Sequence, residues 1–139
     1  MSKASDTKNH YESVTNSIRV VVQPSYLEDQ SAPHASRWVW AYSIEIFNEG
    51  QETVQLRARH WTITDAMGKV ETVDGPGVVG EQPILNPGDE FHYTSGCPLA
   101  TPSGFMVGHY EMVRDDGSVF EAAIPAFSLD LPNARASLN

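Results

Sequence analysis

Residues 38–47, WVWAYSIEIF, have a clear β-strand pattern. Large apolar side chains recur at every second position of this stretch, and polar Ser43 and Glu45 fall between them. A spacing of two is the period of a β-strand with one buried face and one face toward water. We therefore expect a half-buried strand, and its inward residues are Trp38, Trp40, Tyr42, Ile44 and Ile46.

Six further segments of similar character lie on both sides of this stretch. Glycines (10) and prolines (9) are spread between them as turn residues, and no amphipathic helix pattern is found. The predicted strands, besides 38–47, are residues 17–23, 53–64, 69–73, 90–95, 105–113 and 119–127. This pattern predicts an all-β fold, namely an immunoglobulin or fibronectin type III-like β-sandwich of about seven antiparallel strands.

Two irregularities are expected within these strands. In residues 53–64 the inward set runs Val54, Leu56, Ala58 and then changes parity to Trp61 and Ile63, which predicts a β-bulge or bend near residues 59–60. In the last strand, Pro125 predicts either an edge position or a break in the hydrogen-bond ladder.

The length of 139 residues predicts one domain. We expect a flexible polar tail at residues 1–16, the single domain at 17–132 and a C-terminal tail at 133–139. No apolar run approaches the roughly 20 residues of a membrane helix, and no apolar segment follows the first lysines. Together with a lone cysteine, Cys97, which we interpret as a structural side chain, this predicts a cytoplasmic protein with no membrane partner.

The net charge of the chain indicates which classes of partner are repelled and which are favoured. Nine Lys plus Arg against eighteen Asp plus Glu give a formal charge of −9, which repels DNA and RNA. We therefore expect no nucleic-acid partner. The same field favours cations and basic protein surfaces, or serves only solubility.

Residues 74–89 are expected to form a long loop, and it contains Gly75, Gly77 and Gly80 in the spacing G-x-G-x-x-G. In a dinucleotide fold these glycines join a strand to a helix, whose N-terminus holds the pyrophosphate. Here Pro83 follows too soon for such a helix, so a Rossmann-type site is not expected. An anion nest of loop amides stays open, although nearby carboxylates oppose it.

Catalytic and metal sites are not predicted. The five histidines show no metal-ligand spacing, and no nucleophile or acid–base constellation is present. We expect a protein that is not an enzyme and has no catalytic residues, no metal ligands and no cofactor.

Residues 59–112 contain, in order, RHW, GPGVVGEQP, PGDEFHYTSG and TPSGFMVGHYEM. This combination resembles the ApaG family, also called CorD, and the resemblance runs from about Val20 to Pro132. It implies a fibronectin type III-like sandwich and a bacterial cytosolic protein with no established enzymatic activity. It also implies a link to cobalt resistance and magnesium efflux, and related eukaryotic domains look like protein-interaction modules.

Two hypotheses of function follow. The first is a module that binds an unidentified protein partner, with an interaction surface made of the 74–82 loop and Arg59, His60, Trp61 and Asp74. The second is a binder of pyrophosphate or a dinucleotide, with metal bridging phosphate to Asp74 and Glu81. Its ligand-binding residues are Gly75, Gly77, Gly80, Glu81 and Gln82. A homodimer through exposed edge strands stays open.

Overall fold

The computed structural model describes residues 10–132. Within them lie nine strands and two short 3-10 helices. In chain order these are β1 (Tyr11–Thr15), β2 (Ile18–Tyr26), η1 (Glu28–Gln30), η2 (Pro33–Ala35), β3 (Trp38–Asn48), β4 (Val54–Asp65), β5 (Val70–Pro76), β6 (Ile84–Leu85), β7 (Glu90–Leu99), β8 (Gly104–Arg114) and β9 (Val119–Leu129).

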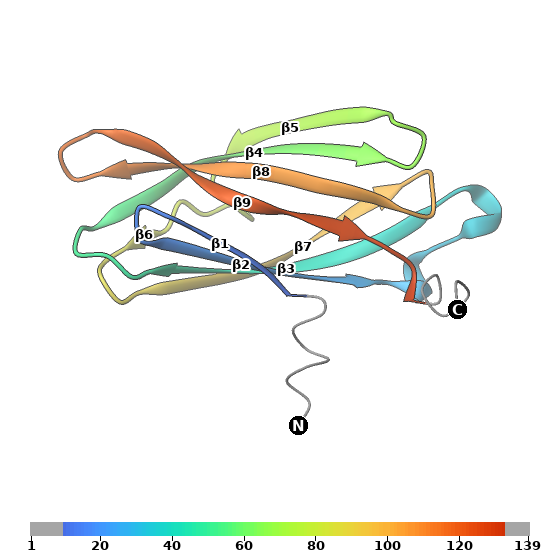
Figure 1. Cartoon of the computed structure of the whole chain (residues 1–139), viewed down its shortest axis with the longest axis horizontal. Helices are drawn as coiled ribbons and strands as arrows, with labels where there is room; N and C mark the ends of the chain where they lie inside the picture. The colour runs from blue at the N-terminus through green and yellow to red at the C-terminus, as the bar shows by residue number, and fades with distance from the viewer. Residues whose placement is uncertain (1–9, 133–139) are drawn as a thin grey trace, which may run out of the picture.

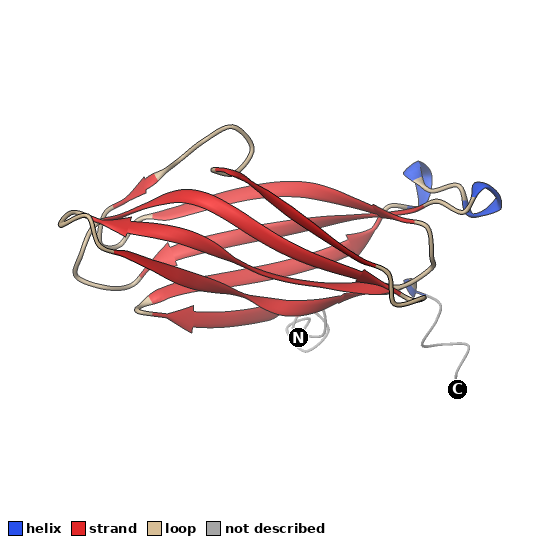
Figure 2. Ribbon diagram, turned by 90° about the horizontal axis from the view of Figure 1, so that it is seen from above, coloured by secondary structure: helices blue, strands red, loops and turns tan. Residues whose placement is uncertain are grey.

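The strands form two antiparallel sheets that pack face to face, as Figures 1 and 2 show. One sheet has the order β1-β2-β3-β7. The other has the order β5-β4-β8-β9, and β6 pairs with β4. The predicted β-sandwich is therefore confirmed. The strand count exceeds the expected seven because β1 and the two-residue β6 were not expected.

The core lies between the sheets and follows the period of two. Trp40, Tyr42, Ile44 and Ile46 of β3 are buried as predicted, whereas Trp38 at the strand end is half-buried. The facing sheet contributes a matching row from β8, made of Met106, Tyr110 and Met112. Burying one large apolar side chain of this kind is worth about 1.5–3 kcal/mol, so these rows hold the two sheets together.

The N-terminal boundary of the domain differs from the prediction. Residues 11–15, expected to belong to a tail at 1–16, form β1 and pair with β2. The Tyr11 ring packs 6.1 Å from the ring of Phe127, which gives this polar segment an apolar anchor. A strand with one aromatic residue among Glu, Ser and Thr is not apparent from hydrophobic alternation. Residues 1–9 and the predicted tail at 133–139 lie outside the described residues.

The predicted bulge in β4 exists but lies earlier. The register against β8 shifts between Leu56 and Ala58, which makes Arg57 the extra residue. As a result Arg59 shares the inner face with buried Trp61, and His60 points outward. Half-buried Ala58 fits either parity, so the sequence pattern misplaced the slip by about two residues.

Both expectations for Pro125 are confirmed. β9 forms one edge of its sheet, and its register against β8 shifts between the pairs Met106–Phe127 and Gly108–Ile124, on either side of Pro125. The long loop expected at residues 74–89 is shorter than predicted, because β5 extends to Pro76 and β6 occupies residues 84–85.

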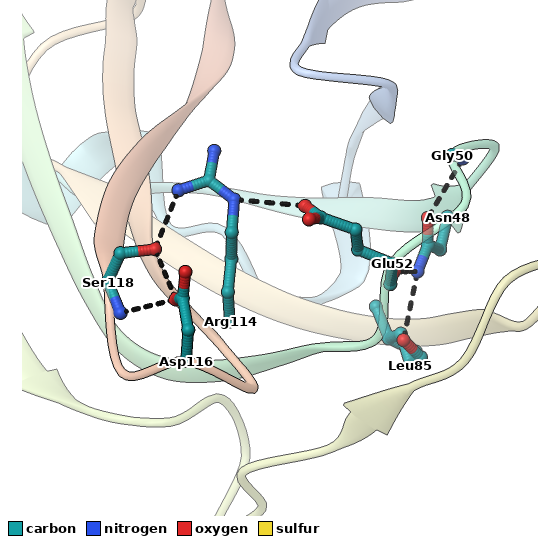
Figure 3. Close-up of polar contacts among 7 residues, drawn as sticks. All are labelled: Asn48, Gly50, Glu52, Leu85, Arg114, Asp116 and Ser118. Carbon is teal, nitrogen blue, oxygen red and sulfur yellow. Dashed lines mark hydrogen bonds and ion pairs between the residues drawn. The ribbon is translucent and has the colours of Figure 1, made fainter.

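One end of the sandwich is held by buried and charged polar contacts (Figure 3). Asn48 is 2% exposed, and its amide group donates to the carbonyls of Glu52 and Leu85 at 2.8 and 2.9 Å. The Arg114 guanidinium lies 3.2 Å from the Glu52 carboxylate and donates to the Ser118 hydroxyl at 3.1 Å. These contacts link β3, the β3–β4 turn, β6, β8 and the β8–β9 turn. The buried Asn48 amide finds its partners here, as buried polar groups generally must.

Candidate functional site

Gly75 lies in β5, and the residues that follow it, 77–82, which we call the glycine loop, fold as a tight hairpin turn. Val79 and Gly80 have φ of 42° and 82°, and the N–H groups of Val78 and Glu81 donate to each other's carbonyls at 2.8 and 2.9 Å. Two successive positive φ values are the signature of a type I′ turn, which favours glycine. Val78 is fully buried and anchors the turn, while Val79 at the tip is exposed.

The loop amides are largely used inside the protein. Gly77 N–H donates to the Arg57 carbonyl at 2.8 Å, and the amides of Val78 and Glu81 are paired across the turn. A Cβ at Gly77 would lie 2.1 Å from the Glu81 carbonyl oxygen, so the glycine is required by packing. Amides that already donate to main-chain oxygens are not available to a phosphate.

Arg59, which was expected in the interaction surface beside this loop, is a cation that contacts the loop directly. Its guanidinium packs against Gly75 and donates to the carbonyls of Pro76 and Gly77 at 3.1 and 2.9 Å. The side chain is half-buried and reaches the loop because the bulge at Arg57 turns it to the inner face. Its charge is therefore directed at loop carbonyls, and it fastens the loop to β4.

Trp61 requires a correction, because it was expected in the interaction surface. It is 2% exposed and packs edge-on against Tyr42 and Phe127, with ring centroids 5.3 and 5.9 Å apart. A large aromatic ring opposite a strand of apolar residues is a core residue here. Of the expected surface, His60, Asp74, Glu81 and Gln82 remain accessible to a partner.

The outer face of the β5-β4-β8-β9 sheet brings His60 and Asp74 together. They lie opposite each other in the register, and the Nδ1 atom of His60 contacts the Asp74 carboxylate. His109 is opposite His60 on the other side, and the two imidazole rings stack at 5.0 Å and 24°. The Nε2 atom of His109 lies 3.5 Å from the Glu121 carboxylate. Two histidines 49 positions apart thus become neighbours through strand pairing, which residue spacing cannot reveal.

This row does not amount to a metal centre. Within residues 10–132, no group of three or more His, Cys, Asp or Glu side chains is arranged to hold a metal ion. Two stacked histidines with a carboxylate on each side form a polar, titratable strip on a sheet face. Such a strip is suited to hydrogen bonding with another surface.

Exposed apolar side chains adjoin this row. Phe105 and Val107 of β8 and Val70 of β5 are 47%, 37% and 57% exposed. The register places Val70, Thr64 and Phe105 in one row, and Thr72, Thr62 and Val107 in the next. These rows share the face of His60, because their positions differ by two residues along each strand. We call Val70, Phe105, Val107, His60 and Asp74 the outer patch.

Buried titratable groups lie between the sheets and away from this patch. The hydroxyl oxygens of Tyr93 and Tyr110 are 2.5 Å apart, and burial raises the pKa of both phenols above the usual value of 10. Burial and, to a smaller extent, the Glu71 carboxylate raise the pKa of the Cys97 thiol from 9.0 to about 11. These groups stay neutral near pH 7, so Cys97 is a structural thiol as expected and not a reactive one.

Comparison with known proteins identifies the family. The family model for the ApaG domain matches residues 28–114. The chain belongs to the ApaG family. Protein ApaG of Rhodospirillum centenum is 63% identical over 129 residues, which cover 93% of this chain and 99% of that protein. Protein ApaG of Paramagnetospirillum magneticum is 60% identical over the same length and the same shares.

A solved structure supports the same assignment. The crystal structure of an ApaA protein from Bordetella pertussis is 46% identical and superposes with a TM-score of 0.82, covering 84% of this chain and 95% of that one. The ApaG domain match spans the glycine loop and the three strands of the outer patch, β4, β5 and β8, but ends before β9. Since β9 supplies buried Ile124 and Phe127, the folded unit extends beyond the matched segment.

Proposed function

We propose that this ApaG-family protein is a non-enzymatic binding module that recognises another protein. The observation that carries the proposal is the outer patch, where Val70, Phe105 and Val107 are exposed beside the polar pair His60–Asp74. Apolar side chains gathered on an open sheet face and bordered by polar groups are typical of protein contacts. The exposed loop residues Glu81 and Gln82 follow β5 in the chain and extend this surface.

The loop geometry supports protein binding over the pyrophosphate alternative. Binding through the outer patch uses side chains that already face solvent. Pyrophosphate binding would instead use loop amides, and those of Gly77, Val78 and Glu81 already donate to carbonyls of this chain.

The proposed cellular role is indirect. The resemblance to the ApaG family implies a link to cobalt resistance and magnesium efflux, and we propose that the protein acts on cation balance through its partner in the cytoplasm. Among the described residues, no helix is long and apolar enough to cross a membrane.

Site-specific photo-cross-linking in the native host tests this proposal. A benzophenone amino acid at position 107 is expected to give a discrete adduct with one protein. The same group at Val14, an exposed valine on β1, is the matched control and is expected to give none. Adducts of equal yield from both positions, or none from position 107, would contradict the proposal.

A further inference from the structure

Strand β5 has one paired edge and one open edge. It hydrogen-bonds to β4 on one side and ends the order of its sheet on the other. Figure 1 shows β5 at the upper border of the molecule with no strand beyond it. Six of its residues are exposed and Gly75 is half-buried, so neither face of the strand is covered.

The register identifies the main-chain groups on the open edge. At one end of the ladder the Lys69 carbonyl accepts from Asp65 N–H, and at the other Gly77 N–H donates to the Arg57 carbonyl. In an antiparallel pair the residues facing the partner alternate, so odd-numbered residues of β5 face β4. The N–H and carbonyl groups of Val70, Thr72 and Asp74 therefore point away from the sheet.

These outward groups have no hydrogen-bond partner among residues 10–132. Within this range, no hydrogen bond outside the strand ladders involves a main-chain atom of these three residues, and Asp74 is bonded only through its side chain. Pro76 holds the next outward position, where the absence of an N–H disturbs no ladder bond. Unpaired edge groups on an exposed strand are a template for another strand.

The other edges of the sandwich are less suited to this role. On the opposite side, the Ser13 hydroxyl donates to the Ala123 carbonyl at 2.8 Å, and Ala123 N–H donates to the Thr15 hydroxyl at 3.1 Å, so β1 and β9 close on each other. β7 is also an edge strand, and the same alternation turns Glu90, His92, Thr94, Gly96 and Pro98 outward, so glycine and proline occupy two of its five outward positions. Glycine and proline weaken strand pairing.

The charge around β5 indicates what would pair with it. β5 contains Glu71 on one face and Asp74 on the other and no Lys or Arg, within a chain of net charge −9. A second copy of the chain would bring like charges to this edge, which disfavours self-pairing. A hollow on the Glu71 side has an apolar wall made of Ile63, Pro98, Leu99 and Ala100, and its rim contains the charged residues Asp65, Lys69 and Glu71.

We infer that the open edge of β5 is a strand-addition site for an extended, basic segment of the partner protein. The added strand pairs with the main chain of Val70, Thr72 and Asp74. Its lysine or arginine side chains lie beside Asp74 on the outer face, and its alternate apolar side chains contact the hollow on the inner face. The inference rests on the proposed function and names the chemistry of its partner.

The test uses the full chain and a defined probe. The probe is an acetylated peptide of about ten alternating lysine and valine residues, and its binding is measured from amide NMR spectra of the protein. A peptide with glutamate in place of lysine is the charge control. Saturable shifts are expected at the amides of Val70, Thr72 and Asp74 with the basic peptide only. Thr72→Pro removes one outward N–H and should weaken binding about tenfold or more.

Thr72→Val is the matched variant, because it keeps the N–H and the β-branched shape and should bind as the parent does. Equal binding by Thr72→Pro, or no shifts at the three amides, would overturn strand addition. That failure would leave the proposed function to be judged by the adduct from position 107. A dimer of the protein alone that Thr72→Pro dissociates would also overturn the inference, because the edge would then pair with a second copy.

Discussion

The glycine loop and strand β5 are consecutive in the chain but opposite in hydrogen bonding. In the loop, the amides of Gly77, Val78 and Glu81 donate to carbonyls of the same protein. In β5, hydrogen bonding to β4 alternates along the strand, so the amides of Val70, Thr72 and Asp74 face away from the sheet. The spacing G-x-G-x-x-G therefore marks a segment in which the amides of Gly77, Val78 and Glu81 already have acceptors.

A main chain can bind a partner only where its donors and acceptors are not already paired within the protein. Glycines permit positive φ and close packing, and at Gly77 both are used to seat the Val78 turn. A free edge strand keeps its donors and acceptors in extended order, which another strand can match. The unpaired groups next to the motif, and not the motif, have the capacity to bind.

The largest predicted effect concerns the rigidity of the loop. Gly77→Ala should lower the free energy of unfolding by about 3–5 kcal/mol, because it adds a clash with the Glu81 carbonyl to a strained φ. Gly80→Ala is the matched control, since its φ of 82° is also positive but its Cβ would meet no atom within 4 Å. It should cost about 1–2 kcal/mol. Chemical denaturation of both variants measures the difference, and equal losses would contradict a tightly packed loop.

Proline substitutions in β5 distinguish its two edges. Val73→Pro should cost about 3 kcal/mol, since Val73 N–H faces β4 in the ladder. Thr72→Pro should cost less than about 1 kcal/mol, because its N–H faces away. Urea denaturation compares the two. If Thr72→Pro is as costly as Val73→Pro, the assignment of the open edge is wrong.

Alkaline pH tests the buried Cys97 thiol of β7. The folded pKa of Cys97 is raised from 9.0 to about 11, so the neutral thiol is favoured in the folded state. Stability is then fully present below pH 9 and falls as the pH rises toward 11, because only the unfolded thiol ionises in that range. The loss attributable to Cys97 reaches about 2–3 kcal/mol.

Cys97→Ala is the control for this pH dependence. It should remove the thiol part of the slope between pH 9 and 11, and the raised pKa values of Tyr93 and Tyr110 should sustain the remainder. Chemical denaturation at each pH measures the free energy of unfolding of both proteins. If its slope against pH is the same in Cys97→Ala, the thiol does not contribute.

The smallest predicted effect is the response to pyrophosphate. Titration of the protein with pyrophosphate or ADP, with and without Mg²⁺ or Co²⁺, should leave the amides of Gly77, Val78 and Glu81 unmoved in NMR spectra, because they already have acceptors. Saturable shifts confined to these amides would restore the phosphate hypothesis.

Much of the fold is predictable from the sequence, because buried strands repeat apolar residues at every second position. Trp40, Tyr42 and Ile44 indicate β3 directly, and Pro125 indicates the irregular edge strand. β1 is missed because its alternating residues are mostly polar, with Tyr11 as the one aromatic anchor.

The candidate site is less predictable, because it depends on register. The extra residue Arg57 decides that Arg59 turns inward and His60 outward, and half-buried Ala58 hides its position. His60 and His109 meet only through strand pairing. The sequence around Trp61 fits both an exposed aromatic anchor and a core residue. Its contact with Tyr42 of the opposite sheet shows that it is a core residue.

Native-state amide hydrogen exchange tests directly whether the outward amides of β5 are free while those of the glycine loop are bonded. Val70, Thr72 and Asp74 are predicted to exchange close to the rate of an unprotected chain, since their N–H groups face solvent. Gly77 and Val78 are predicted to exchange at least about a hundredfold more slowly, since their amides are bonded and buried. Protection of the three β5 amides together with rapid exchange at Gly77 and Val78 would contradict the account.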